Sequence, residues 1–289
     1  MYGIIPGMND CVEVSKEVGV KKASKSVKFL IFRGIMAGMM IGFAALVSTI
    51  ASMNLTKNPE TYGIGKIVQG FVFSGGLIMV VLSGAELFTG NNLMLIALFD
   101  RKIGPKGLLK NWGCVYLGNL IGSLFLALLV AFSGIFQANS GVLGSSLAGI
   151  MTAKTSLSVG SSLVLGILCN FLVCLAVFMA FGAKTVSGKL LACIFPVMFF
   201  VAAGFEHSIA NMFYIPVGFF AAGNVDILAF LANLIPVTVG NVIGGAILAV
   251  LVYYSTEKCD IIRLCKRCKN FEKTEKSKKK SKKIETKKK

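Results

Sequence analysis

Six long apolar stretches limit what this 289-residue chain can fold into more than any other feature of its sequence. A helix needs about 20 mostly apolar residues to cross the hydrocarbon core of a bilayer, and each stretch provides at least that many. We therefore expect an all-α integral membrane protein that crosses the bilayer several times. The six expected transmembrane helices lie at residues 27–53, 64–100, 107–133, 158–182, 187–222 and 229–255.

The distribution of charge supports a membrane protein and argues against a nucleic-acid-binding protein. Charged residues make up 15% of the chain, against about 25% in soluble domains. Residues 258–289 carry +11 of the net charge of +17. We expect residues 257–289 to be a lysine-rich, disordered cytoplasmic tail near anionic lipid. Its cysteines lack a second ligand pair, so we expect reduced thiols of unassigned role, with no metal and no cofactor: Cys259, Cys265 and Cys268.

Basic residues outside the tail gather in alternate loops, which predicts the orientation in the membrane. We expect both termini, with residues 1–26 as the N-terminal segment, on the cytoplasmic side of the cell (inner) membrane. The loops expected on that side carry Lys16, Lys21, Lys22, Lys25, Lys28, Arg101, Lys102, Lys106, Lys110, Lys184 and Lys189. The loops expected on the opposite side carry only Lys57, Lys66 and Lys154.

Two nine-residue motifs mark an internal repeat. GAELFTGNN (84–92) and GFEHSIANM (204–212) share glycine, glutamate and asparagine at their first, third and eighth positions, 120 residues apart. The pair GNLIG (118–122) and GNVIG (240–244) has nearly the same offset, 122 residues. Because three spans per repeat is an odd number, the second repeat must have inverted topology. The transmembrane domain, residues 27–256, then consists of the repeats 27–133 and 158–256.

Each nine-residue motif interrupts a long apolar segment, so we expect helices two and five to be broken. Such a break is tolerated only where the loop is buried in protein or lines an aqueous path. We expect Gly84, Gly90 and Gly204 to give the turns their backbone freedom, and each glutamate to accept loop N–H bonds that hold the break. The residues expected in this structural role are Gly84, Gly204, Glu86, Glu206, Asn91 and Asn211.

Two other features of the repeat carry expectations. The glycines of the GN motifs predict close helix packing, and the amides of Asn119 and Asn241 must bond across helices in a bilayer. His207 is the only histidine of the chain, and it stands where the first motif has Leu87. A buried histidine satisfied by hydrogen bonds is the simpler explanation. However, an ionisable residue inside a membrane span is a functional candidate by default.

These motifs resemble those of the formate/nitrite transporter family, over most of residues 10–257. The stretches that carry the resemblance are GAELFTGN (84–91), LGNLIG (117–122), LCNFLVCLAVFMA (168–180), GFEHSIANM (204–212) and PVTVGNVIGG (236–245). The resemblance implies an aquaporin-like fold and a homopentamer with one pore in each protomer. It also implies that small monovalent anions, or their conjugate acids, pass through the pore.

The resemblance further assigns roles to particular residues of this chain. It implies that His207 and Thr89 act in the pore and in proton transfer, that Asn170 and Asn241 are pore-side amides, and that Lys154 lies in a vestibule. The apolar constrictions would be Phe73, Leu77, Leu87, Phe88 and Phe200.

A bare anion would lose hydration that such apolar side chains cannot replace. We hypothesise that Lys154 attracts the anion, and that the anion gains a proton with His207 involved. Formate is the favoured substrate, with hydrosulfide and nitrite as alternatives; acetate and lactate also fit such a pore.

Three functions of other classes remain open at this stage. A membrane enzyme could use Glu206 and His207 as acid and base, although the sequence shows no nucleophile, metal-ligand cluster or cofactor motif. A water or glycerol channel would carry Asn-Pro-Ala in both loops, where this chain has Thr-Gly-Asn and Ile-Ala-Asn. A membrane scaffold would use the basic tail to bind lipid.

Overall fold

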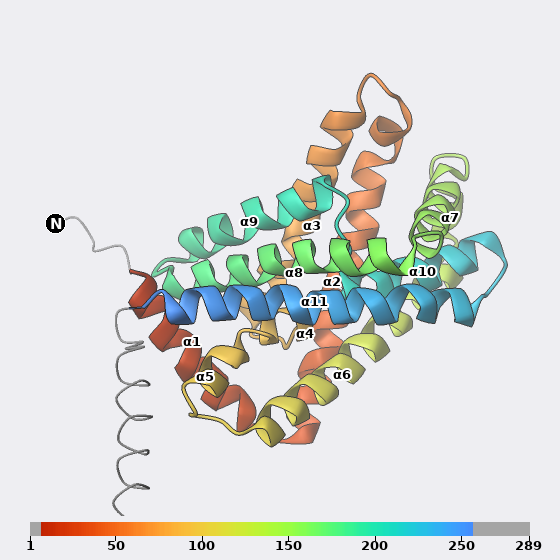
Figure 1. The fold of residues 1–289 in the computed structure, drawn as a ribbon. Helices are drawn as coiled ribbons and strands as arrows, with labels where there is room; N and C mark the ends of the chain where they lie inside the picture. Colours follow the sequence, from red (N-terminus) through yellow and green to blue (C-terminus); the bar gives the residue numbers. More distant parts are fainter. Residues whose placement is uncertain (1–6, 257–289) are drawn as a thin grey trace, which may run out of the picture.

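The computed structural model describes residues 7–256, and every regular element in that range is helical. The expectations for the tail, including its three cysteines, therefore lie outside the described residues. The elements are α1 (Met8–Ala23), α2 (Val27–Lys57), α3 (Tyr62–Ser83), α4 (Phe88–Asn91), α5 (Met94–Phe99), α6 (Pro105–Phe132), a 3₁₀ turn (Ile135–Gln137), α7 (Val142–Thr155), α8 (Val159–Gly182), α9 (Val186–Ala202), α10 (Ser208–Ala222) and α11 (Ile227–Tyr254) (Figure 1).

Five helices in the described part of the chain are long and apolar enough to cross a membrane: α2, α3, α6, α8 and α11. The second expected span contains α3 and the short helices α4 and α5. The fifth contains α9 and α10, which are also too short for a full crossing by themselves. Residues 84–87 and 204–207 lie outside the helices. They fall within the two nine-residue motifs.

The two halves of the chain pack in the same pattern. In the first half α2 packs against both α3 and α6, and in the second half α8 packs against both α9 and α11. In Figure 1, α8, α9 and α11 run together across the view, while α2 and α3 stand side by side. Contacts between α3 and α9 and between α10 and α6 join the halves.

Glycines in the GN motifs allow helices to approach closely within each half, as the sequence predicts. A Cβ on Gly118 would lie 2.5 Å from the carbonyl oxygen of Ile31, and one on Gly122 would overlap the carbonyl of Ile35. In the second half, a Cβ on Gly244 would overlap the carbonyl of Ile167 in the same way. The expectation of close packing at these glycines is confirmed.

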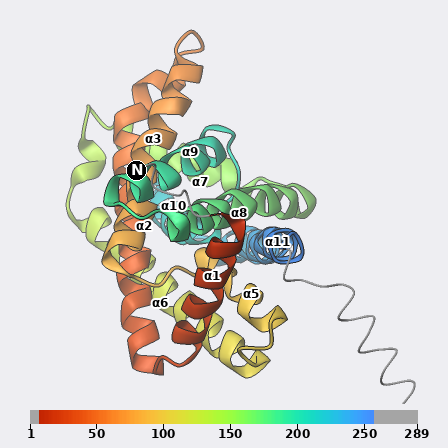
Figure 2. The ribbon, with the colours of Figure 1, turned by 90° about the vertical axis from the view of Figure 1, so that its left-hand side faces the viewer.

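Two helices, α1 and α7, were not expected from the sequence, because each is short and partly polar. Helix α1 packs on α5 and α8 (Figure 2), and the Lys16 ammonium lies 3.3 Å from the Asp100 carboxylate beyond α5. Helix α7 packs on α10, where it helps to bury that helix. Residues 8–23 are thus part of the packed structure, and both helices carry residues of the site described next.

Candidate functional site: two loops and a row of cavities

The two loops turn at their first glycines and meet near the centre of the molecule. Gly84 has φ +68° and Gly204 has φ +76°, left-handed values that glycine adopts without steric cost. Gly90, in contrast, lies inside α4. The loops lead to Leu87 and His207, the extended residues that cap α4 and α10. Thr89 Oγ1 then lies 3.0 Å from His207 Nε2, which joins the two loops.

An asparagine from a neighbouring helix anchors each loop through two hydrogen bonds and makes a third to another helix. Asn119 accepts from the backbone N–H of Phe88 at 3.0 Å and donates to the carbonyl oxygen of Glu86 at 2.9 Å. Asn241 bonds Ser208 and Glu206 in the same way, at 2.9 Å each. Each asparagine also donates to a helix across the packing interface, at Gly34 and Gly166, both at 2.8 Å. The expected bonds across helices are confirmed, and their role is to hold the loops.

The two loop glutamates are buried, and each is neutralised by a lysine. Glu86 lies 2.7 Å from the Lys22 ammonium, and Glu206 lies 2.8 Å from that of Lys154. Each carboxylate also accepts from the asparagine five residues later in the chain, at 2.7 and 2.6 Å. These donors are side chains, where the sequence had suggested backbone N–H groups of the loop. A buried carboxylate with a cation and an amide donor avoids most of the cost of its burial.

Three cavities lie in a row between the halves. The first, which we call the Lys154 cavity, has a volume of about 270 Å³ and is lined by both polar and apolar residues, including Lys154, Glu206 and His207. The second, the Lys22 cavity, has about 240 Å³ and lies against Lys22 and Glu86. Between them is a central cavity of about 10 Å³, close to the minimum that one water molecule needs.

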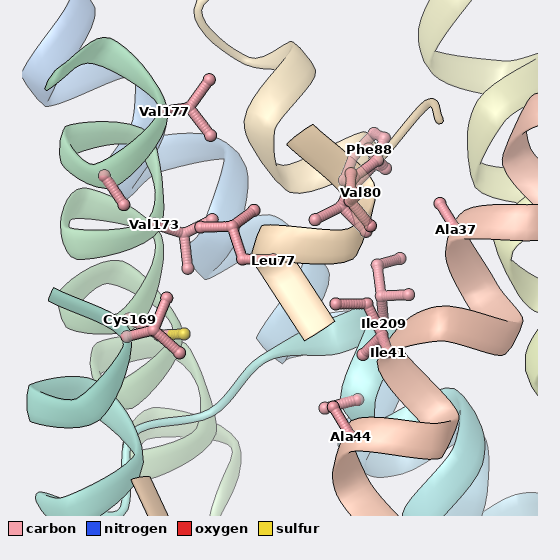
Figure 3. Close-up of a cluster of buried hydrophobic side chains, with 14 of the residues drawn as sticks. Ala37, Ile41, Ala44, Leu77, Val80, Phe88, Cys169, Val173, Val177 and Ile209 are labelled. Carbon is pink, nitrogen blue, oxygen red and sulfur yellow. The ribbon is translucent and has the colours of Figure 1, made fainter. Parts of the chain in front are cut away.

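Apolar side chains separate the central cavity from the cavities on either side. Phe73 and Phe200 line both the central and the Lys154 cavities, and their ring centroids are 5.9 Å apart. Leu77 and Leu87 line both the central and the Lys22 cavities. Figure 3 shows other apolar side chains of the central region, among them Ile41 of α2 and Val173 of α8. A solute that moves along this row must pass two apolar constrictions.

His207 is the polar side chain that lines the central cavity. Its Nδ1 accepts the backbone N–H of Ala210 at 3.1 Å, which caps α10, and its ring stacks on Phe200 at 5.8 Å between centroids. Because Nδ1 accepts, the neutral ring carries its hydrogen on Nε2. The bond to Thr89 Oγ1 is therefore donated by Nε2.

The structure places most, but not all, of the expected pore residues along the row. His207, Lys154, Phe73, Leu77, Leu87 and Phe200 line it. Thr89 and Phe88 are not among the residues that line the three cavities: Thr89 is buried against His207, and Phe88 packs edge-to-face on Trp112 and Tyr116. Asn170 donates to the backbone carbonyls of Thr89 and Asn241, at 3.3 and 2.6 Å. Neither expected pore-side amide is among the residues that line the three cavities; Asn170 and Asn241 bond backbone groups instead.

Sequence reasoning missed several lining residues, of which Lys22, Lys66 and Gln69 are polar. A signal for Lys22 existed, since two repeated buried glutamates each require a cation. A further pair of equivalent residues was also present in the sequence: Asn111 and Asn233, which are 122 residues apart. Asn111 accepts a hydrogen bond from Asn91, and Asn233 accepts one from Asn211.

Several known proteins are similar to this chain in sequence and in fold. A sequence model described as "Formate/nitrite transporter" matches residues 9–255. The "Formate channel FocA" of Haemophilus influenzae is 37% identical over 257 residues, which cover 82% of this chain and 90% of that protein. The "Uncharacterized transporter YrhG" of Bacillus subtilis is 40% identical over 247 residues, 85% and 91% of the two chains.

Two solved structures have the same fold. One, described as "Pentameric formate channel with formate bound", gives a TM-score of 0.70 at 33% identity and covers 83% of this chain and 97% of its own. Another, an "FNT family ion channel", gives 0.73 at 27% identity, with coverage of 86% and 98%. The chain is therefore an integral membrane protein of the class of channels and transporters. Proteins of this class are not enzymes. It belongs to the formate/nitrite transporter family.

Proposed function

We propose that this protein is a channel for small monovalent anions of weak acids, with formate as the first candidate substrate. The observation that carries the proposal is the row of three cavities, with apolar constrictions on both sides of one buried histidine. The similarity to proteins named as formate channels supports the choice of substrate. Nitrite and hydrosulfide, which are also small and monovalent, are the alternatives within the family.

The proposed architecture has six spans in two inverted repeats, residues 27–133 and 158–256, in an aquaporin-like arrangement. In this arrangement α3 with α4 and α5, and α9 with α10, form the two broken spans. The equivalent bonds of Asn119 and Asn241, and the equivalent pairs of Glu86 and Glu206, support the repeat. Each protomer holds one pore in a homopentamer, as in the structure described as pentameric. Both termini lie on the cytoplasmic side of the cell membrane, as the basic loops predict.

Neutralisation is the proposed way across the constrictions. A hydrated anion cannot fit in a central cavity of about 10 Å³, and moving a bare ion into an apolar region costs tens of kcal/mol. We infer that the anion accepts one proton beside His207, supplied by water of the cavity that the anion has entered, and crosses as the neutral acid. It releases the same proton in the cavity on the other side.

Both ring nitrogens of His207 already take part in hydrogen bonds, and only the bond at Nε2 can be exchanged without uncapping α10. Nδ1 is occupied by the N–H of Ala210, so a second ring proton would require the loss of the bond that caps α10. Nε2–H and the Thr89 hydroxyl are the groups that face each other between the loops. In the proposed step Nε2–H exchanges its bond to Thr89 Oγ1 for one to the anion, the Thr89 hydroxyl also donates to the anion, and the ring is neutral before and after transport.

The proposal is tested by flux of formate, nitrite, hydrosulfide, acetate and lactate into proteoliposomes, with and without a pH gradient. His207→Asn and His207→Phe are compared with the unmodified protein. Asparagine is a good helix cap, so His207→Asn keeps a capping acceptor for α10 and separates folding from transport. We expect a more acidic exterior to accelerate uptake by the unmodified protein. Neither variant should show this acceleration. Unaltered rates and pH dependence in both would contradict the role of His207.

A further inference from the structure

One face of α3 follows the whole row of cavities. Lys66, Gln69 and Phe73 line the Lys154 cavity, Phe73 and Leu77 line the central cavity, and Leu77 and Val81 line the Lys22 cavity. The spacing of these residues repeats every three, four or seven positions, which keeps them on one side of a helix. Lys66 is seven residues before Phe73, or about 10 Å along the helix axis. Lys66 and Gln69 therefore precede the first apolar constriction on the same face.

In each of the two larger cavities, a lysine compensates the charge of the loop glutamate. Glu86 and Lys22 form a neutral pair in one cavity, and Glu206 and Lys154 form a neutral pair in the other. The Lys154 ammonium also lies 5.7 Å from the centre of the Tyr214 ring, which holds it further. Lys154 is thus already committed to a carboxylate and an aromatic ring. It contributes little net attraction for an anion.

Lys66 has no such compensation. Its ammonium donates to the side-chain oxygen of Gln69 at 3.2 Å, and among residues 7–256 the structure gives it no carboxylate partner. The Lys154 cavity therefore carries one uncompensated positive charge, that of Lys66. A cavity with one sign of charge and apolar walls concentrates ions of the opposite sign.

The pair of Lys66 and Gln69 also offers hydrogen-bond donors of suitable chemistry. An ammonium has three donors, and Gln69 uses one of them. Because the amide oxygen of Gln69 accepts this bond, its two N–H donors remain for another acceptor. A carboxylate or nitrite ion has two oxygens that can accept from both groups at once.

We propose that Lys66 and Gln69 form a receiving site for a small monovalent oxyanion in the Lys154 cavity. In this site Lys66, not Lys154, supplies the attraction that draws the anion toward Phe73. This inference rests on the proposed anion transport and assigns its first binding step. It concerns how often the pore is occupied at low anion concentration, and it leaves the step at His207 unchanged.

The test measures initial formate uptake into proteoliposomes over a range of formate concentrations. Lys66→Met should raise the half-saturating concentration by about tenfold and leave the maximal rate close to that of the unmodified protein. Lys66→Arg should restore most of the loss, and Gln69→Leu should show a smaller rise. Lys57→Met is the matched control: Lys57 is the last residue of α2, its ammonium donates to Ser145 of α7, and it does not line the cavity.

The outcomes separate this inference from the function on which it rests. Uptake by Lys66→Met that matches Lys57→Met at every concentration would overturn the receiving site, while transport itself would stand. A fall in the maximal rate with no change in half-saturation would also overturn it. If the unmodified protein transports no small anion, both the proposed function and the receiving site are overturned. Raised salt should reduce the difference between Lys66→Met and the unmodified protein, because salt screens the attraction.

Discussion

Replacing Lys154 by methionine should destabilise the protein, because it removes the cation that neutralises buried Glu206. The Glu206 side chain is 5% exposed, and its carboxylate lies 2.8 Å from the Lys154 ammonium. Removal of one partner of a buried ion pair costs about 3–5 kcal/mol. The amide of Asn211 still donates to Glu206 at 2.6 Å, so we expect the lower end, about 3 kcal/mol. This corresponds to a fall in Tm of about 6–12 °C.

A double-mutant cycle measures this effect by thermal unfolding in detergent and formate flux in proteoliposomes. Because Glu206→Gln removes the charge that Lys154→Met leaves unpaired, the double variant should unfold within about 1 kcal/mol of the unmodified protein. Its flux should also recover, since no unpaired carboxylate then faces the Lys154 cavity. Lys57→Met is an exposed control and should change stability by less than about 0.5 kcal/mol. Equal destabilisation and equal loss of flux in Lys154→Met and in the double variant would refute the reasoning.

Two further substitutions test the loops and the constrictions. Asn241→Leu leaves the N–H of Ser208 and the carbonyl of Glu206 without their hydrogen bonds. Each unsatisfied buried group costs about 1–3 kcal/mol, so we expect thermal unfolding to show a loss of stability of at least about 2 kcal/mol. A change below about 1 kcal/mol would contradict the anchoring role. Phe73→Ala should widen the constriction between the Lys154 and central cavities and raise acetate flux relative to formate flux. An unchanged ratio in folded protein would show that Phe73 does not limit the size of the solute.

The sequence predicted several membrane-spanning helices because that prediction depends on local apolar length, and the motifs behind the proposed repeat are short as well. Apolar length marks the spans, and the two GN motifs, 122 residues apart, correspond to equivalent hydrogen bonds at Asn119 and Asn241. Helices α1 and α7 were missed because neither has the length or apolarity of a span. Their positions depend on packing against α5 and α10, which no local pattern records.

The lining of the cavities was only partly predictable, since it depends on where side chains point. The chain has 22 phenylalanines, and composition cannot separate those in a constriction from those in the core. Phe88 illustrates this, because its ring packs on Trp112 and Tyr116. The Lys22–Glu86 pair joins residues 64 positions apart, so it follows from the tertiary fold alone. Lys154 was expected in a vestibule, where it would attract the anion, and its pairing with Glu206 became visible only in the structure.

The central claim, that the anion crosses the constrictions as its neutral acid, is tested most directly by measuring formate and proton uptake together. Proteoliposomes with an internal pH indicator are supplied with formate, and the slow uptake of protein-free vesicles is subtracted. We predict one proton taken up for each formate, with an initial rate that does not change when a potassium diffusion potential is imposed. Uptake that follows the membrane potential, without internal acidification, would show that the bare anion crosses and would contradict the account.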